Sequence, residues 1–192
     1  MLGALLTVAA YLVGSISFGL IAASQQGIDL RSIGSGNVGA TNVGRALGPG
    51  MGRKVLILDL LKGLAPVALA RWVFDLPWPW ITAVGIAAVV GHCFPIWHGL
   101  RGGKGAATAA GVLLAALPPI GVATFATWVV VKKTSRRASV ASLSSATLAA
   151  ALAVVIYGAD WPARLALGLW MLIVVRHASN IGRLLRGREP PG

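Results

Sequence analysis

Two glycine-rich segments carry basic residues that could bind an anion. The first is residues 35–42, a run of small and polar residues with the sequence Ser-Gly-Asn-Val-Gly-Ala-Thr-Asn, and Arg45 follows it. Backbone N–H groups and short side chains in such a run can all point at one anion, because glycine permits the turns that this requires. A polar loop of this kind is costly beside apolar segments, so we expect it to bind a ligand.

The second segment is residues 99–105, Gly-Leu-Arg-Gly-Gly-Lys-Gly, which leads directly into an apolar run. A helix that begins there would present its unpaired N–H groups and the positive end of its dipole to the ligand. Lys104 adds a mobile positive charge. The paired glycines could instead serve only a tight turn, with the basic residues acting as topology signals. The placement of both Arg45 and Lys104 among glycines favours a phosphate.

A third polar segment, residues 176–189, follows the last apolar run and combines basic residues with His177 and Asn180. If the segment is helical, these two side chains lie three residues apart on one face, where the last span meets water. We therefore expect both to contact the ligand. The later arginines are expected to form a solvated tail, and Glu189 to pair with a basic neighbour.

The elements that must position these segments are those of a membrane protein. Hydrophobic residues make up 56% of the 192 residues, charged residues only 11%, and the mean hydropathy is +0.78. This composition predicts an all-α integral membrane protein with a single domain over residues 1–192. Seven transmembrane helices are expected, at residues 1–23, 55–74, 80–97, 105–117, 119–131, 139–157 and 163–175. The net charge of +12 lies at the ends of these segments, which favours lipid headgroups and excludes nucleic acid as a partner.

The apolar run at residues 105–131 contains Pro118-Pro119 and could cross the membrane once, with a kink, or twice. Two crossings place every Lys and Arg except Lys62, Arg71 and Arg164 on one face, so the positive-inside rule predicts a hairpin of two short helices. The N-terminus is then outside and the C-terminus cytoplasmic. All three polar segments emerge on the cytoplasmic side, where one pocket could take both a soluble substrate and an acyl chain.

Asp59 and Lys62 lie three residues apart in an apolar segment, where each ionised group costs about 2.5–3.5 kcal/mol. They are predicted to form a structural ion pair, with a role in substrate entry as the alternative. Ser142 lies about one turn from the basic residues 136–137 and could reach the pocket. Two matches to nucleotide-binding motifs are rejected. Residues 34–39 fit the glycine pattern of a dinucleotide-binding fold but follow an apolar helix and not a strand, and the Lys104 loop lacks the flanking residues of a P-loop. No closed metal site has the required spacing.

The three segments together resemble the bacterial acyl-phosphate:glycerol-3-phosphate acyltransferase family, PlsY. The resemblance is carried by residues 34–48, GSGNVGATNVGRALG, residues 91–108, GHCFPIWHGLRGGKGAAT, and residues 176–189, RHASNIGRLLRGRE. It implies an acyltransferase of the bacterial inner membrane with a cytoplasmic active site. Such an enzyme moves a fatty acyl group from acyl phosphate to the sn-1 hydroxyl of glycerol 3-phosphate, giving lysophosphatidic acid and phosphate, the first step of phospholipid synthesis. The resemblance implies no cofactor, no acyl-CoA and no metal, and a monomer is expected.

The resemblance also implies which residues act. One set of residues is expected to bind glycerol phosphate and to stabilise the developing charge, namely Ser35, Arg45, Lys104, His177 and Asn180. A second set is expected to form the phosphate-binding loops and to bind acyl phosphate, namely Gly36, Asn37, Thr41, Gly102, Gly103 and Ser142. No His has an Asp five positions later, so the usual general-base pattern is absent and the donor's phosphate is hypothesised to accept the proton. A transporter of organic phosphates and a lipid phosphatase are the alternatives. The sequence shows no internal repeat, which a transporter would be expected to have, and no nucleophile beside a base, which a phosphatase would need.

Overall fold

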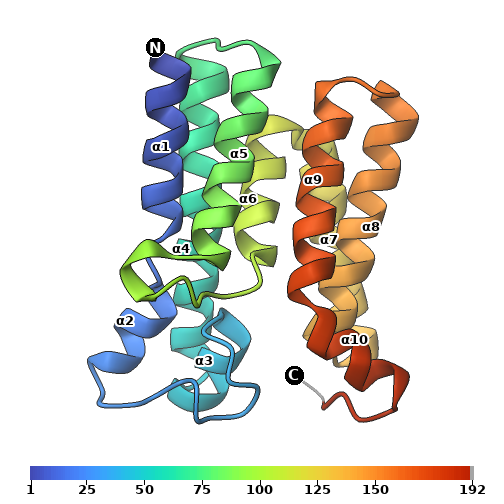
Figure 1. Cartoon of the computed structure of the whole chain (residues 1–192). Helices are drawn as coiled ribbons and strands as arrows, with labels where there is room; N and C mark the ends of the chain where they lie inside the picture. The colour runs from blue at the N-terminus through green and yellow to red at the C-terminus, as the bar shows by residue number, and fades with distance from the viewer. Residues whose placement is uncertain (191–192) are drawn as a thin grey trace.

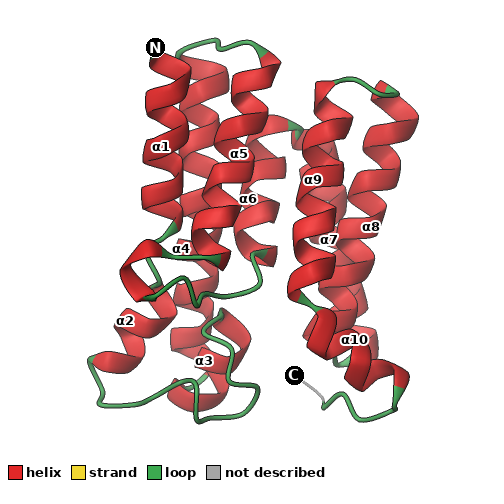
Figure 2. Ribbon diagram, in the orientation of Figure 1, coloured by secondary structure: helices red, strands yellow, loops and turns green. Residues whose placement is uncertain are grey.

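The computed structural model describes residues 1–190, and these residues contain helices and loops but no strand (Figure 2). The helices that position the site come in chain order. They are α1 (Leu2–Gly14), α2 (Phe18–Ser24), α3 (Ala40–Leu47), α4 (Pro49–Ala68), the π turn η1 (Leu69–Val73), α5 (Trp78–Cys93), the 3-10 turn η2 (Ile96–His98), α6 (Ala106–Ala116), α7 (Pro118–Ser135), α8 (Ala138–Tyr157), α9 (Trp161–Arg176) and α10 (Ala178–Leu185).

The long helices form two groups that stand side by side (Figure 1). Helices α1, α4, α5 and α6 make one group, and α7, α8 and α9 make the other, while the short helices α2, α3 and α10 lie together at one end. Glycines allow the first group to pack closely. A methyl group on Gly63 of α4 would lie 2.1 Å from the Thr108 carbonyl oxygen of α6, and one on Gly111 of α6 would lie 2.0 Å from the Leu60 carbonyl oxygen. Small residues thus bring the two backbones into contact, which is the usual way in which helices associate in lipid.

Three helical stretches within residues 1–190 are long and apolar enough to cross a membrane, namely Leu2–Ser24, Trp78–His98 and Ala138–Tyr157. A fourth is obtained if α9 and α10, which are bent by 62° with respect to each other, count as one broken span. The seven crossings expected from the sequence therefore stay a prediction. Large apolar side chains such as Val155 and Met171 are exposed on the outer faces of α8 and α9, as lipid contact requires.

The apolar run interrupted by two prolines consists of two helices, as expected for a hairpin. Helix α6 ends at Ala116 and α7 begins at Pro118, where the missing N–H of proline is harmless because a first-turn N–H has no intrahelical partner. A methyl group on Gly121 would lie 2.6 Å from the Cα and N atoms of Leu114, so the chain reverses tightly and α7 returns along α6. The predicted division of this run into two helices is confirmed, although α7 continues to Ser135, beyond the expected end at residue 131.

The largest differences from the expected boundaries lie in the first two apolar segments. The first apolar segment is broken at residues 15–17, where the Ser15 hydroxyl donates to the Tyr11 carbonyl oxygen at 2.8 Å and α1 ends. Helix α4 begins at Pro49, six residues before the expected start at residue 55, and Gly48 precedes it with a φ of 86°. Hydropathy marks where apolar residues begin, whereas a helix begins where the backbone is capped, so the polar first turn of α4 was missed.

Candidate functional site

Asn42 holds the first glycine-rich loop in shape. Its side-chain amide donates to the carbonyl oxygens of Leu30, at 3.1 Å, and Ile33, at 2.9 Å, and its Oδ1 accepts the N–H of Ser35 at 3.1 Å. Gly34 adopts a φ of 56°, in the left-handed region that favours glycine, and a methyl group there would lie 2.5 Å from Asn42 Oδ1. Because Asn42 is only 1% exposed, its bonds are shielded from water. Asn42 belongs to the first polar segment, but nothing in the sequence pattern indicated this function.

The second loop is anchored from two elements. Gly102 and Gly103, which we call the glycine strap, donate their N–H groups to the main-chain carbonyls of Cys93 and His92, at 3.1 Å each. Arg176, the last residue of α9, donates to the strap's two carbonyls at 3.0 and 3.1 Å. The strap therefore connects the end of α5 to the end of α9, and its position determines where the residue after it can reach.

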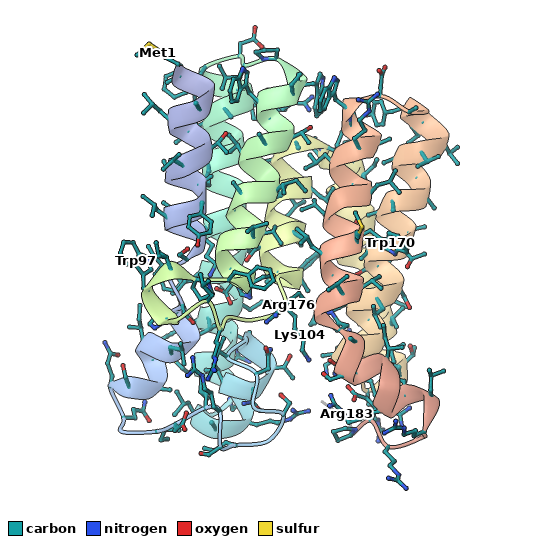
Figure 3. The ribbon with its side chains drawn as sticks, in the orientation of Figure 1. Met1, Trp97, Lys104, Trp170, Arg176 and Arg183 are labelled. Atoms are coloured by element: carbon teal, nitrogen blue, oxygen red, sulfur yellow. The ribbon has the colours of Figure 1, made fainter. Side chains whose placement is uncertain are left out.

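That residue, Lys104, points into the space between the two groups of helices, at the end of the molecule opposite to Met1 (Figure 3). Its ammonium group donates to Oδ1 of Asn180 on α10, which joins the second polar segment to the third. Burial, followed by the positive charge of Arg183, lowers the pKa of Lys104 to about 8. An incoming dianion would raise this pKa again and stabilise the charged form of Lys104, so the site is suited to bind phosphate.

Glu189 orients the opposite wall of the site. Its Oε1 accepts from the Ser139 hydroxyl and from the Asn180 amide, at 2.6 Å each, and its Oε2 accepts from Arg183 Nε at 2.7 Å. The expected pairing of Glu189 with a basic neighbour is thus confirmed. Although burial raises its pKa, the hydrogen bonds from Ser139, Asn180 and Arg183 together hold the pKa of Glu189 below its ordinary value. Because the Asn180 amide donates to Glu189, its oxygen is turned toward Lys104.

His177 lies at the bend between α9 and α10, so residues 176–189 do not form the continuous helix considered in the sequence analysis. Its Nδ1 is 2.8 Å from the carbonyl oxygen of Ile173. A carbonyl can only accept, so Nδ1 carries the proton and donates, and Nε2 of the neutral ring is left with its lone pair. The bend replaces the expected helical face, yet it brings His177 and Asn180 to the same pocket.

The structure brings most of the residues assigned from the sequence to one pocket between the two helix groups. The assigned residues that line it are Ser35, Asn37, Thr41, Arg45, Lys104, Ser142, His177 and Asn180. The assigned glycines Gly36, Gly102 and Gly103 do not line it, because they shape the loops behind the lining side chains. The lining also includes Asp59, His92, Arg183 and Glu189, which were not assigned to the site from the sequence, although the last two lie within the third segment.

The pocket has a polar end and an apolar end. The polar end lies where α3, α6 and α10 meet, and the apolar end continues between α6, α7, α8 and α9. Its apolar lining includes Leu113, Phe125, Trp128, Ala146, Ala149, Ala166, Leu169 and Trp170. Along α8 the lining runs from Ser139 to Ala149, about 15 Å at the rise of an α-helix. A charged headgroup with an attached hydrocarbon chain matches this division of polar and apolar walls.

Ser142 lies in α8 between these two ends, and its hydroxyl accepts a hydrogen bond from Trp128 Nε1 at 3.2 Å. The bond joins α7 to α8 at the point where the lining changes from polar to apolar. Ser142 therefore lies at the junction between the polar and the apolar lining, and its hydroxyl proton is left for a second partner.

Several known proteins resemble this chain in sequence. A family model described as glycerol-3-phosphate acyltransferase matches residues 4–187. Curated relatives named glycerol-3-phosphate acyltransferase include one from Anaeromyxobacter sp. (strain K), 45% identical over 98% of this chain and 96% of its own length. Another, from Aquifex aeolicus (strain VF5), is 44% identical over 96% of both chains.

Two solved structures are also similar. The crystal structure of PlsY, an integral membrane glycerol 3-phosphate acyltransferase, in its glycerol 3-phosphate form has a TM-score of 0.95 and 41% identity, covering 100% of this chain and 96% of that chain. Its lysophosphatidic acid form has a TM-score of 0.91 and 40% identity, covering 100% and 95%. These matches confirm the resemblance inferred from the three polar segments.

Proposed function

This chain belongs to the glycerol-3-phosphate acyltransferase family, and we propose that it transfers a fatty acyl group from acyl phosphate to the sn-1 hydroxyl of glycerol 3-phosphate. The products are lysophosphatidic acid and inorganic phosphate. The observation that carries the proposal is the two-ended pocket, in which Lys104, Arg45 and Asn180 line one end and alanine, leucine and aromatic side chains line the other. An enzyme that joins a water-soluble phosphate to a fatty acyl group needs both kinds of wall.

Each end of the pocket has a defined task. Lys104 and Arg45, with Ser35 and Asn180, hold the phosphate of glycerol 3-phosphate by hydrogen bonds, which are charge-assisted for Lys104 and Arg45, and stabilise charge that develops during transfer. Nε2 of His177 carries no proton, so His177 accepts a hydrogen bond from a hydroxyl of the glycerol. Asn37, Thr41 and Ser142 contact the phosphate of the donor, and the glycine strap and Gly36 set the loops behind them. The acyl chain lies in the apolar end, so the reacting carbonyl is placed at the junction near Ser142.

The transfer proceeds without a protein general base. The sn-1 oxygen forms a bond to the acyl carbon, the bond from that carbon to the phosphate oxygen breaks, and the departing phosphate takes both the electron pair and the hydroxyl proton. A mixed anhydride has a good leaving group, so positioning and charge stabilisation suffice. The arrangement around His177 supports this mechanism, because its Nδ1 donates to the neutral Ile173 carbonyl and not to a carboxylate that would make the imidazole a stronger base.

The proposed enzyme lies in the bacterial cell membrane, acts as a monomer, and has its active site at the cytoplasmic face. Seven helices would cross the bilayer, with the N-terminus outside and the C-terminus cytoplasmic. The basic residues of the site gather at the end opposite to Met1, which agrees with the positive-inside rule, and the similar PlsY structures are of an integral membrane protein (Figure 3).

The topology is tested by cysteine labelling in cells. With buried Cys93 replaced by serine, single cysteines at Arg101 and Arg186 are expected to react with a membrane-impermeant maleimide only after the cytoplasmic side is opened. A cysteine at Arg164 is expected to react from outside without opening. Labelling of Arg101→Cys and Arg186→Cys from opposite sides would exclude a shared pocket at one face.

The activity is tested with purified protein and three acyl donors. Acyl phosphate is expected to support formation of lysophosphatidic acid, with one phosphate released per product, whereas acyl-CoA and acyl carrier protein derivatives are expected to support none. Phosphate release from glycerol 3-phosphate alone would indicate a phosphatase. Movement of glycerol 3-phosphate into vesicles without acyl transfer would indicate a transporter, and either result would contradict the proposal.

A further inference from the structure

A buried polar cluster lies against the glycine strap, and two of its members, Asp59 and His92, also line the pocket. Lys62 Nζ is 2.9 Å from Asp59 Oδ1, which confirms the expected ion pair, and it also donates to the Ile16 carbonyl oxygen at 2.7 Å. His92 joins the pair, since its Nδ1 lies 3.6 Å from the same Asp59 oxygen and 3.2 Å from the Thr108 hydroxyl. None of these side chains is more than 8% exposed. The substrate assignments above give this cluster no task.

The His92 ring forms the surface on which Gly103 rests. A methyl group on Gly103 would lie 2.3 Å from Nε2 of His92, and the three atoms nearest to it all belong to that ring. Gly103 is not among the glycines with a positive φ, so its backbone conformation is open to alanine. The ring, and not the turn, therefore requires glycine at this position.

The ring has little freedom to move. The Asp59 carboxylate and the Thr108 hydroxyl both lie on its Nδ1 side, and the main-chain carbonyl of His92 accepts the N–H of Gly103 at 3.1 Å. Rotation of the imidazole would separate Nδ1 from its hydrogen-bond partner, the Thr108 hydroxyl, and from the Asp59 carboxylate 3.6 Å away, inside the protein where unpaired polar groups are costly. The strap is thus held by the backbone of His92 on one edge and by its ring on one face.

We propose that His92, fixed by Asp59 and Thr108, is a positioning residue that sets the place of the glycine strap and thereby how far Lys104 reaches into the phosphate end of the pocket. The inference rests on the proposed function, because it gives this cluster a part in binding glycerol 3-phosphate. It replaces a purely structural reading of the Asp59–Lys62 pair. A shift of the strap moves the ammonium group of Lys104 away from its ligand, and a misplacement of about 1 Å is enough to cost activity.

The test is a double-mutant cycle with a binding readout that does not depend on turnover. His92→Asn keeps a polar atom near the Nδ1 position and removes the outer part of the ring. Gly103→Ala adds the methyl group that meets the ring, and the double variant combines the two. His98→Asn, the same substitution in the nearby η2 turn, is the matched control. Acetylation of Lys104 is followed by mass spectrometry at increasing glycerol 3-phosphate, together with KM for each substrate and the thermal midpoint.

The expected result is selective. His92→Asn raises the concentration of glycerol 3-phosphate that half-protects Lys104, and the KM for that substrate, by about tenfold, while the KM for acyl phosphate stays within about twofold and His98→Asn behaves as the wild type. Gly103→Ala costs far more activity in the native background than in the His92→Asn background, since the shortened side chain relieves the contact.

Other outcomes overturn the inference. Equal protection of Lys104 in His92→Asn and His98→Asn, or strictly additive costs in the cycle, would show that the ring does not position the strap. A wild-type protein whose Lys104 is not protected by glycerol 3-phosphate would overturn the phosphate assignment of the proposed function as well. If His92→Asn does not fold, Thr108→Val is used instead, because it replaces only the hydroxyl with a methyl group. The inference then requires that Thr108→Val raise the KM for glycerol 3-phosphate without changing the KM for acyl phosphate.

Discussion

Lys104→Ala is expected to lower kcat/KM for glycerol 3-phosphate by about 10²–10³, the loss that follows removal of one group that stabilises developing charge. The ammonium group lies at the polar end of the pocket and donates to Asn180, and among the described residues no other lysine lines the pocket. Arg45→Ala, at the same end, is expected to lower activity by a similar order. Arg186, in the exposed tail, is the matched control, and Arg186→Ala is expected to stay within about twofold.

The pH profile distinguishes loss of charge from loss of shape at Lys104. The pKa of Lys104 is lowered to about 8, so its ammonium group loses its proton, and its attraction for phosphate, as the pH rises through about 8. kcat/KM of the wild type should therefore fall on the alkaline side with an apparent pKa near 8, because this parameter reports the free enzyme. Lys104→Ala should lack that alkaline limb. Identical profiles in the two proteins, or equal activity of the Lys104, Arg45 and Arg186 variants with folding intact, would refute the assignment.

Glu189→Ala is expected to reduce kcat/KM by about 10²-fold and to lower the thermal midpoint by several degrees, since Ser139 and Asn180 are buried and leaving a buried donor without its acceptor costs about 1–3 kcal/mol. Its carboxylate accepts from Ser139, Asn180 and Arg183, and alanine would leave these donors without that acceptor. Asn180 would then no longer be turned toward Lys104.

Glu189→Gln separates the charge of this residue from its shape. Glutamine retains an acceptor oxygen, so the thermal midpoint should fall less than in Glu189→Ala. The carboxylate of Glu189 raises the pKa of Lys104 against the neighbouring arginines, so its neutralisation should lower that pKa and move the alkaline limb of kcat/KM to lower pH. An unchanged limb in Glu189→Gln would show that Glu189 acts only as a structural support.

Features that depend on residue type and local order were predictable from the sequence. Composition and hydropathy predicted a helical membrane protein. The two prolines at 118–119 predicted a kink or a break, because proline cannot continue a helix without losing a hydrogen bond, and the placement of basic residues favoured the hairpin. The ion pair of Asp59 and Lys62 followed from their spacing, since residues three apart on a helix are neighbours. The three polar segments predicted the residues that line the polar end, and their order along the chain indicated the family.

Contacts between distant segments were decided only by the tertiary structure. Nothing in the spacing of Arg176 indicates that it binds the carbonyls of the glycine strap, and nothing in the pattern around His92 indicates that its ring meets Gly103. Local sequence determines charge, hydropathy and backbone preference, which act over a few residues. Hydrogen bonds and van der Waals contacts form only within about 4 Å, so the partners of a side chain depend on how closely whole helices pack. In this protein that packing is set by glycines on facing helices.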